Sequence, residues 1–310
     1  PDRHTFIRGD IRDRELAETI LREQEIDTIV HFAAESHVDR SLAAPDAFVQ
    51  TNIVGTFSLL EAARRVWLEE KHLGKAKVRF HHISTDEVYG SLEPDGMPFR
   101  EDSPYAPSSP YAASKAGSDH LVRAYGHSYG LPYTISNCSN NYGPYQFPEK
   151  LVPLVITNAL AGEPLPVYGD GLQVRDWLYV SDHCEVIWKI LQDGREGENY
   201  NIGGGNQRTN IELVRTICRL LDEANVNSPV QPHEELIQYV PDRPGHDRRY
   251  ALDISKIRNE LGWRPRHSLE KGLKTTIYWY LAHSEWREAI QNREDYGDWM
   301  RANYGERGKK

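Results

Sequence analysis

Two short stretches of the sequence carry side chains that could perform acid–base chemistry. The first is Ser84–Gly90, which follows the apolar run Val78–Ile83 and so lies where a buried strand would end. The second is Tyr111–Lys115, which opens a helical pattern after a proline-containing loop. Residues four apart share one face of a helix, so Tyr111 and Lys115 would lie side by side. Because a lysine cation beside a phenol favours the phenolate, Tyr111 is a candidate acid/base.

A Tyr-x-x-x-Lys spacing is weak evidence by itself, because short motifs recur by chance and would also fit an exposed helix surface. Thr85, Asp86 and Glu87 add a hydroxyl and two carboxylates. Two adjacent carboxylates can act as acid and base only if their environments differ. Neighbours on a strand point to opposite faces, so both carboxylates could serve one substrate only if the backbone leaves regular strand geometry here.

The elements around these stretches alternate between strand and helix. We predict strands over residues 5–9, 28–33, 78–83 and 133–138, and helices over 13–24, from 45 and from 110. This rhythm is typical of an α/β fold with a doubly wound, Rossmann-type parallel sheet. Ligands bind such sheets beyond the carboxyl ends of the strands, so the polar residues there would share one rim.

After Gly143 the pattern changes to shorter helices and strands, among them helices over 151–160 and 210–222. We therefore expect a Rossmann-type domain over residues 1–143. A smaller α/β lobe over 144–310 would close over the rim, with some of its segments returning to the first domain.

One feature of a nucleotide-binding sheet is missing near Pro1. Such sheets usually begin with a strand, a glycine-rich turn that holds a pyrophosphate, and a helix. Gly203–Gly205 comes too late in the chain to be that turn. If residues 5–9 form the third strand of a 3-2-1-4-5-6 order, the first two strands are absent. We therefore expect an N-terminally truncated chain whose sheet has a gap.

Composition narrows the class of protein. The 310 residues carry a net charge of −9 without a basic run, which argues against nucleic acid as a partner. Cys138, Cys184 and Cys218 have no metal-type spacing and are interpreted as buried thiols in a reducing compartment. No apolar run approaches the ~20 residues that span a bilayer, and no signal peptide is visible. These features predict a cytoplasmic protein without a membrane partner.

Taken together, the motifs resemble the extended short-chain dehydrogenase/reductase superfamily. More narrowly, they resemble the dTDP-glucose 4,6-dehydratases of rhamnose and other deoxysugar pathways. Tyr-x-x-x-Lys marks only the superfamily, whereas Thr85-Asp86-Glu87 is more specific because a sugar 4-epimerase needs no acid pair. The stretches that carry the resemblance are His31–Ser41, Ser84–Gly90, Pro110–Lys115, Asn137–Lys150, Arg175–Trp177, Asp242–Tyr250 and Leu261–Trp263.

The resemblance implies NAD-dependent conversion of dTDP-glucose to dTDP-4-keto-6-deoxyglucose. Tyr111 would take the proton of the C4 hydroxyl, with Thr85 bonded to the same oxygen. Lys115 would lower the pKa of Tyr111 and hold the nicotinamide ribose. After hydride transfer from C4 to NAD, Glu87 would remove the C5 proton and Asp86 would protonate the departing C6 hydroxyl. The hydride would then return to C6, so the cofactor is regenerated.

The same resemblance implies two sets of binding residues. The cofactor set is Asp10, Ile11, Ala33, Ala34, Ser36, Thr51, Tyr111 and Lys115. The substrate set is Ser36, Thr85, Asn140, Lys150, Leu151, Pro166, Val167, Tyr168, Arg175, Asn210, Arg243 and His246. Guanidinium groups suit diphosphate oxygens, although a surface ion pair of Arg175 with Asp176 is an alternative. His37 and Asp39 lack a third ligand at a plausible spacing, so we predict no metal site.

The resemblance also implies a homodimer through a four-helix bundle. Its helices would be the one with Phe48, Phe57 and Leu60 and the one from Tyr111 to Val122. Burial of these faces within one subunit is the alternative. Two other functions remain open at this point: 4,6-dehydration of UDP-glucose, and non-catalytic binding of a sugar nucleotide.

Overall fold

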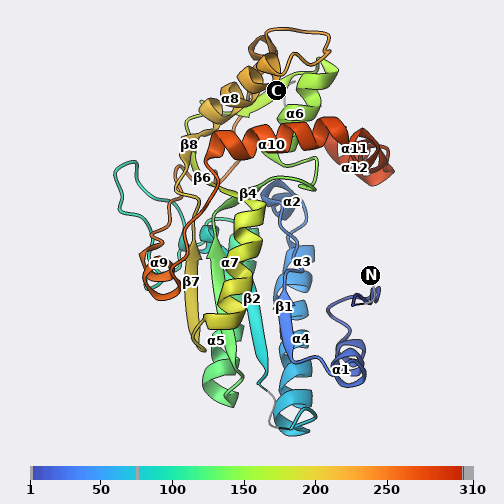
Figure 1. The fold of residues 1–310 in the computed structure, drawn as a ribbon, viewed down its shortest axis with the longest axis vertical. Helices are drawn as coiled ribbons and strands as arrows, with labels where there is room; N and C mark the ends of the chain where they lie inside the picture. The colour runs from blue at the N-terminus through green and yellow to red at the C-terminus, as the bar shows by residue number, and fades with distance from the viewer. Residues whose placement is uncertain (1–2, 75–76, 302, 304–310) are drawn as a thin grey trace.

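The computed structural model describes residues 3–74, 77–301 and 303. A parallel sheet lies at its centre, with β1 (Thr28–His31), β2 (Arg79–Thr85), β3 (Tyr133–Cys138) and β7 (Glu198–Ile202) in the order β1-β2-β3-β7 (Figure 1). The registers pair Thr85 with Cys138 and Cys138 with Ile202. The carboxyl ends of these strands therefore meet at one edge of the sheet.

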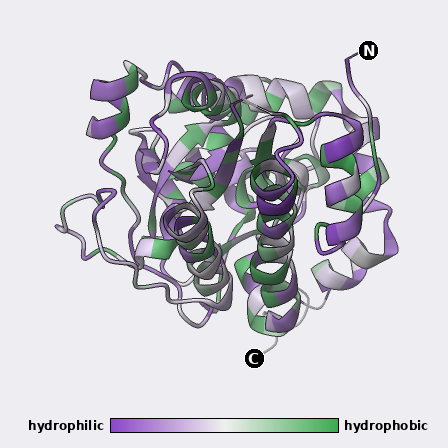
Figure 2. Cartoon of the chain, turned by 90° about the horizontal axis from the view of Figure 1, so that it is seen from below, coloured by the Kyte–Doolittle hydropathy of each residue, from purple (hydrophilic) through white to green (hydrophobic). Residues whose placement is uncertain are grey.

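Helices cover both faces of this sheet. Val122 and Tyr125 of α5 (Pro110–Tyr129) pack with Phe80 of β2. Val186 and Ile190 of α7 (Val180–Asp193) pack with the side chains of β7 on the other face. Figure 2 shows hydrophilic residues spread over the outer helices. The predicted Rossmann-type α/β sheet is confirmed.

The N-terminal strand prediction is wrong. Within the described part of the chain, residues 5–9 form no strand and are exposed. A strand requires a neighbouring ladder of backbone groups, and β1 pairs only with β2 among the described strands. The described sheet is also continuous from β1 to β7, so it has no gap. The helix predicted over 13–24 does form: α1 (Arg14–Glu23) begins at Asp13, whose carboxylate accepts a bond from the Leu16 amide.

A long helical segment follows β1, as predicted from Pro45 onward. It comprises α2 (Val38–Ala43), α3 (Pro45–Phe48), a π-helical stretch (Val49–Gly55), α4 (Thr56–Ala63) and a second π-helical stretch (Arg64–Glu69). Phe48 and Leu60 are buried within the subunit, whereas 42% of the Phe57 side chain is exposed. Only Phe57 of the predicted apolar stripe therefore faces outward, because the other two complete the core beneath the helix.

Most of the remaining elements gather at the upper end of the molecule in Figure 1, whereas the short helix α9 (Ser255–Leu261) packs against β7 of the large sheet. Two small sheets, β4-β6-β8 and β5-β9, pack with the long helices there. The strands are β4 (Asn140–Tyr142), β5 (Leu165–Tyr168), β6 (Val174–Tyr179), β8 (Gln207–Thr209) and β9 (Ile237–Val240). The helices are α6 (Leu151–Ala161), α8 (Asn210–Glu223), α10 (Leu269–Ala282), α11 (Ser284–Gln291) and α12 (Glu294–Met300).

The cysteines differ in their exposure. Cys218 is buried, Cys138 is partly buried and Cys184 is exposed on α7. The interpretation of three buried thiols is therefore right only for Cys218 and is wrong for Cys184, which lies on the outer side of its helix. None of the described helices is long and apolar enough to cross a membrane.

Candidate active site

The backbone changes direction at the end of β2. Thr85 is the last strand residue, and Asp86–Tyr89 form a single 3₁₀ turn. The Thr85 hydroxyl caps this turn by accepting a bond from the Glu87 amide at 3.2 Å. The segment therefore leaves regular strand geometry where the adjacent carboxylates require it.

The two carboxyl groups of this turn lie in different surroundings. Asp86 is 2% exposed, and its Oδ2 atom has no hydrogen-bond partner among the described residues. Burial, followed by the charge of Glu87, raises the pKa of Asp86 well above its usual range. Burial also raises the pKa of Glu87, but the cations Arg243, Arg175 and Lys150 oppose that rise. This asymmetry favours a proton on Asp86 and a charge on Glu87.

Tyr111 and Lys115 lie on α5, whose first turn is capped by Ser109, which accepts a bond from the Ala112 amide. Burial and the Glu87 carboxylate raise the pKa of Tyr111, and the nearby Thr85 hydroxyl offsets this rise only in part. The Lys115 ammonium donates to the Ile83 carbonyl at 2.7 Å. The lowering of the Tyr111 pKa by Lys115 stays a prediction, and in the described structure burial and Glu87 outweigh it.

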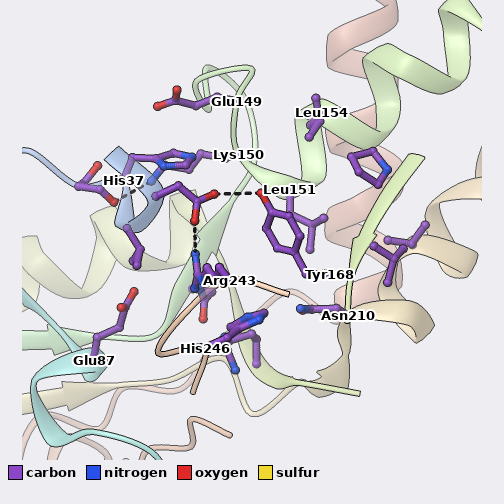
Figure 3. Close-up of a pocket in the computed structure, with 18 of the residues that line it drawn as sticks. His37, Glu87, Glu149, Lys150, Leu151, Leu154, Tyr168, Asn210, Arg243 and His246 are labelled. Atoms are coloured by element: carbon purple, nitrogen blue, oxygen red, sulfur yellow. Dashed lines mark hydrogen bonds and ion pairs between the residues drawn. The ribbon is translucent and has the colours of Figure 1, made fainter. Parts of the chain in front are cut away.

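A cavity of about 170 Å³ lies beside Glu87 (Figure 3). Eleven of the twelve predicted substrate-binding residues line it, and Thr85 is the exception. Those eleven are Ser36, Asn140, Lys150, Leu151, Pro166, Val167, Tyr168, Arg175, Asn210, Arg243 and His246. Sequence reasoning missed several other lining residues, namely His37, Val38, Asp39, Glu149, Leu154, Trp177 and Val214. Helical spacing could have found two of them, because Leu154 is three residues after Leu151 and Val214 is four after Asn210.

Cationic and amide groups converge on this cavity. The Arg243 guanidinium lies 3.5 Å from the Asp39 carboxylate, and its buried Nε has no hydrogen-bond partner in the described structure. Lys150 donates to the Ser36 carbonyl at 2.8 Å. The buried side-chain oxygens of Asn140 and Asn210 also lack a partner among the described residues. The cavity therefore offers donors and acceptors to a polar, negatively charged ligand.

Arg175 does not form the alternative ion pair with Asp176 in the described structure. It donates to the carbonyls of Val174 and Asp247, and its guanidinium lies 4.3 Å from the ring centroid of Tyr250. Asp176 instead accepts bonds from the backbone amides of the loop that follows β7. Arg175 therefore stays in the cavity wall.

The histidines of the cavity are neutral. Burial and nearby cations lower the pKa of His37 to about 3 and that of His246 to about 4. In the part of the chain that the structure describes, no group of three His, Cys, Asp or Glu side chains could hold a metal ion.

The predicted cofactor residues come from four segments of the described chain. Asp10 is exposed, and its ion pair with Arg12 lowers the pKa of the carboxyl to about 2. Ile11 follows it, and Thr51 is half-buried in the Val49–Gly55 segment. Ala33, Ala34 and the exposed Ser36 follow β1, while the buried Tyr111 and Lys115 lie on α5.

Asn52 joins two of these segments and was missed from the sequence. Its buried amide accepts from the Glu35 amide at 2.9 Å and donates to the Glu35 carbonyl at 3.0 Å. It also donates to Ser114 of α5 at 2.8 Å. The loop after β1 is thereby tied to the helix that carries Tyr111. An asparagine inside a helical pattern gave no recognisable signal.

Comparisons with known proteins identify the family. A family model described as GDP-mannose 4,6 dehydratase matches residues 1–276. A dTDP-glucose 4,6-dehydratase from Xanthomonas campestris is 58% identical over 93% of this chain and 82% of its own length. The chain belongs to the dTDP-glucose 4,6-dehydratase family.

Solved structures of relatives agree with this assignment. A dTDP-glucose 4,6-dehydratase from Streptomyces venezuelae, solved with NAD and dTDP, has a TM-score of 0.84 and 48% identity, covering 94% of this chain and 83% of that one. A UDP-glucose 4-epimerase from Thermotoga maritima, solved with UDP-glucose, has a TM-score of 0.78 and 29% identity, covering 91% and 86%. The dehydratase family therefore shares its fold with epimerases, and the site must separate the two chemistries.

Proposed function

We propose that this chain catalyses the NAD-dependent 4,6-dehydration of dTDP-glucose to dTDP-4-keto-6-deoxyglucose. The observation that carries the proposal is the Asp86–Glu87 turn beside Tyr111 at the end of β2. Elimination of water needs one carboxyl group that donates a proton and one that accepts a proton. The opposite surroundings of Asp86 and Glu87 meet that need, whereas a 4-epimerase has no use for such a pair.

NAD fits the residues along the carboxyl edge of the sheet. The Asp10 carboxylate can accept from the adenosine end, and the small Ala33 and Ala34 leave room along the edge. The Ser36 and Thr51 side chains supply further hydroxyls, while Tyr111 and Lys115 offer donors for a nicotinamide ribose. When bound, NAD would accept a hydride from C4, return it to C6 and add positive charge near the Tyr111 ring.

Tyr111 is the group that removes the proton of the C4 hydroxyl. Its own environment disfavours the phenolate, because the ring is buried and Glu87 is negative. Added positive charge at the cofactor site would reverse that preference. The Thr85 hydroxyl favours the Tyr111 phenolate and would bond the same C4 oxygen.

Glu87 and Asp86 then perform the elimination. A ketone at C4 acidifies the C5 proton, which the Glu87 carboxylate accepts. The C5 electron pair forms the C5–C6 double bond as the C6–O bond breaks, and Asp86 gives its proton to the departing hydroxyl so that water leaves. Asp86 suits this role because its buried Oδ2 has no competing partner in the described structure. Return of the hydride to C6 and of a proton to C5 completes the 6-deoxy product.

The cavity beside Glu87 binds the nucleotide part of the substrate. Arg243, whose Nε has no partner among the described residues, and the buried Arg175 are suited to the diphosphate oxygens. Lys150 adds a further cation, while Asn140 and Asn210 offer side-chain oxygens that no described residue bonds. The other members of the predicted substrate set complete the wall: Ser36, Leu151, Pro166, Val167, Tyr168 and His246.

The test is incubation of the purified protein with dTDP-glucose and, separately, with UDP-glucose. We expect dTDP-glucose to yield the alkali-sensitive absorbance of a 4-keto sugar at the higher rate. Faster turnover of UDP-glucose would reassign the substrate. No product from either sugar would favour a binding protein without catalytic activity.

We further propose that the chain acts as a cytoplasmic homodimer in deoxysugar biosynthesis, of which rhamnose formation is one route. The partly exposed side chains of Val49, Phe57 and Tyr129 support a helical interface on the α4–α5 side of the sheet. The three free cysteines support a reducing compartment. Residues 1–143 would bind mainly NAD, and residues 144–310 mainly the sugar nucleotide.

A further inference from the structure

A buried polar cluster that the proposed mechanism does not use lies beside Lys115. Its centre is Asp119, one helical turn after Lys115 on α5, and its carboxylate is completely buried. Asp119 Oδ2 accepts from the Ser84 hydroxyl at 2.7 Å and from the Tyr105 hydroxyl at 2.8 Å. Asn137 donates to the same oxygen at 3.4 Å. A buried carboxylate with several donors is held in its charged form, and the pKa of Asp119 is indeed lowered.

The other oxygen of Asp119 faces the surroundings of Lys115. Asp119 Oδ1 lies 3.3 Å from His82 Nε2, and that nitrogen lies 3.4 Å from the Lys115 ammonium. His82 is neutral, because burial and the Lys115 charge lower its pKa to about 4. The imidazole therefore stands between a cation and an anion without carrying charge itself.

A buried ammonium group is costly unless an opposite charge is close. Burial lowers the pKa of Lys115, and Asp119 is the largest influence that raises it. Other titratable groups nearby are His31 on β1 and Cys138 on β3, and burial disfavours the charged form of both. From the loop before α5, Tyr105 contributes a neutral phenol, which bonds the Arg123 guanidinium at 3.3 Å. Among the described neighbours of Lys115, Asp119 is thus the carboxylate that can offset its charge.

We propose that Asp119 is a positioning residue that keeps Lys115 in place and charged, acting across His82 from one helical turn further along α5. The Ser84 and Tyr105 hydroxyls fix the Asp119 carboxylate. The Ile83 carbonyl and His82 then locate the Lys115 ammonium within reach of the cofactor edge. This role rests on the proposed function insofar as Lys115 holds the nicotinamide ribose.

The test replaces Asp119 by asparagine, which keeps the shape and removes the charge. In Asp119→Asn, Lys115 should lose its proton at lower pH, so the alkaline limb of the kcat profile should move down by about one pH unit or more. Calorimetric NAD affinity, measured without sugar, should fall over the same pH range. Because this second readout needs no turnover, it still tests Asp119 if dTDP-glucose is not the substrate.

Asp182→Asn is the matched control. Asp182 is also a buried carboxylate and accepts from the Arg266 and His267 amides, but it lies on α7, away from Lys115. This variant should lose stability without moving either pH profile. An Asp119→Asn variant whose profiles coincide with wild type, or a control that moves them equally, would overturn the proposal.

A double-mutant cycle separates action through Lys115 from a general structural role. In a Lys115→Met background, Asp119→Asn should have no further effect on NAD affinity, because the group through which it acts is gone. Equal, additive losses would contradict the proposal.

Lys115→Met alone keeps the inference testable if Asp119→Asn does not fold. Without the cation, the lowered pKa of Asp119 rises toward its unfolded-state value, so ionisation of this carboxyl group contributes less stability above that value. The melting temperature should therefore fall below wild type by more at pH 6 than at pH 3, where Asp119 is largely protonated. A difference independent of pH would show that Asp119 and Lys115 are not coupled.

Discussion

At the scale of single residues, the proposed active site depends on two neighbouring carboxyl groups with different surroundings. Asp86 lies near the negative charge of Glu87, which one cation, Arg175, opposes, whereas Glu87 lies near three cations, Arg243, Arg175 and Lys150. The sequence could predict that such a difference is needed, because an acid and a base cannot share one environment. It could not supply the cations around Glu87, since they come from segments about 60 to 150 residues further along the chain.

Glu87→Gln should stop elimination but leave oxidation at C4 intact. Glutamine keeps the shape of the side chain and cannot accept the C5 proton, so kcat should fall by about 10²–10⁴-fold. The measurement is incorporation of deuterium at C5 in D₂O, together with the spectrum of reduced cofactor under single-turnover conditions. A variant that still exchanges the C5 proton at the wild-type rate would remove Glu87 from the role of base.

Asp86→Asn should make the protein more stable and less active. The folded-state pKa of Asp86 is raised, so ionisation destabilises the wild type as pH rises from the unfolded-state value toward the folded-state value. Asparagine removes that penalty. The melting temperature should rise by about 2–4 °C for each kcal/mol recovered at pH 7.5, with a smaller gain at pH 4. Product formation should fall because no proton reaches the C6 hydroxyl. A melting temperature that falls at pH 7.5 would contradict a buried, ionisable Asp86.

At the scale of secondary-structure elements, the sequence predicts a helix boundary where interactions between neighbouring residues determine it. Ser109 and Pro110 mark the start of α5 because a cap and a proline at the first helical position need no tertiary partner. The short strands β8 and β9 were not predicted, since their pairing with β6 and β5 is what makes them strands. The strand prediction for residues 5–9 is wrong because strand formation also depends on pairing. The residue pattern there is typical of a strand, but no described neighbour pairs with it.

The same reasoning applies to the helices proposed to form a dimer interface. An apolar stripe could not reveal that Phe48 and Leu60 turn inward while Phe57 turns outward. Phe57→Asp should therefore produce a monomer with its fold intact, because a carboxylate cannot be buried unpaired at an interface. Trp188→Asp on α7 is the matched control, as 62% of that side chain is exposed on the opposite face of the sheet. Sedimentation velocity distinguishes the two. A Phe57→Asp dimer as stable as the wild-type dimer would place the interface elsewhere.

At the scale of the whole molecule, the cavity is assembled from both halves of the chain. Asp39 lies on α2 beside the large sheet, whereas Tyr168 belongs to β5 and Arg243 follows β9. The Tyr168 hydroxyl donates to Asp39 at 2.9 Å, and Arg243 contacts the other oxygen of the same carboxylate (Figure 3). Sequence reasoning reached Arg243 only through the family resemblance and considered Asp39 only as a metal ligand, because long-range contacts leave no local pattern.

Binding of dTDP should therefore stabilise both halves of the molecule against unfolding. Much of this stabilisation should depend on Arg243. A ligand at 100 times its Kd adds about 2.7 kcal/mol to the free energy of unfolding. In Arg243→Ala, the same dTDP concentration should produce a much smaller rise in melting temperature, and KM should increase by roughly tenfold or more as a charge-assisted hydrogen bond is lost. Arg248→Ala is the matched control, because that exposed arginine pairs with Asp170 outside the cavity. If both variants keep the full dTDP-induced shift, the diphosphate does not contact Arg243, and the donors that hold it must be Arg175 and Lys150.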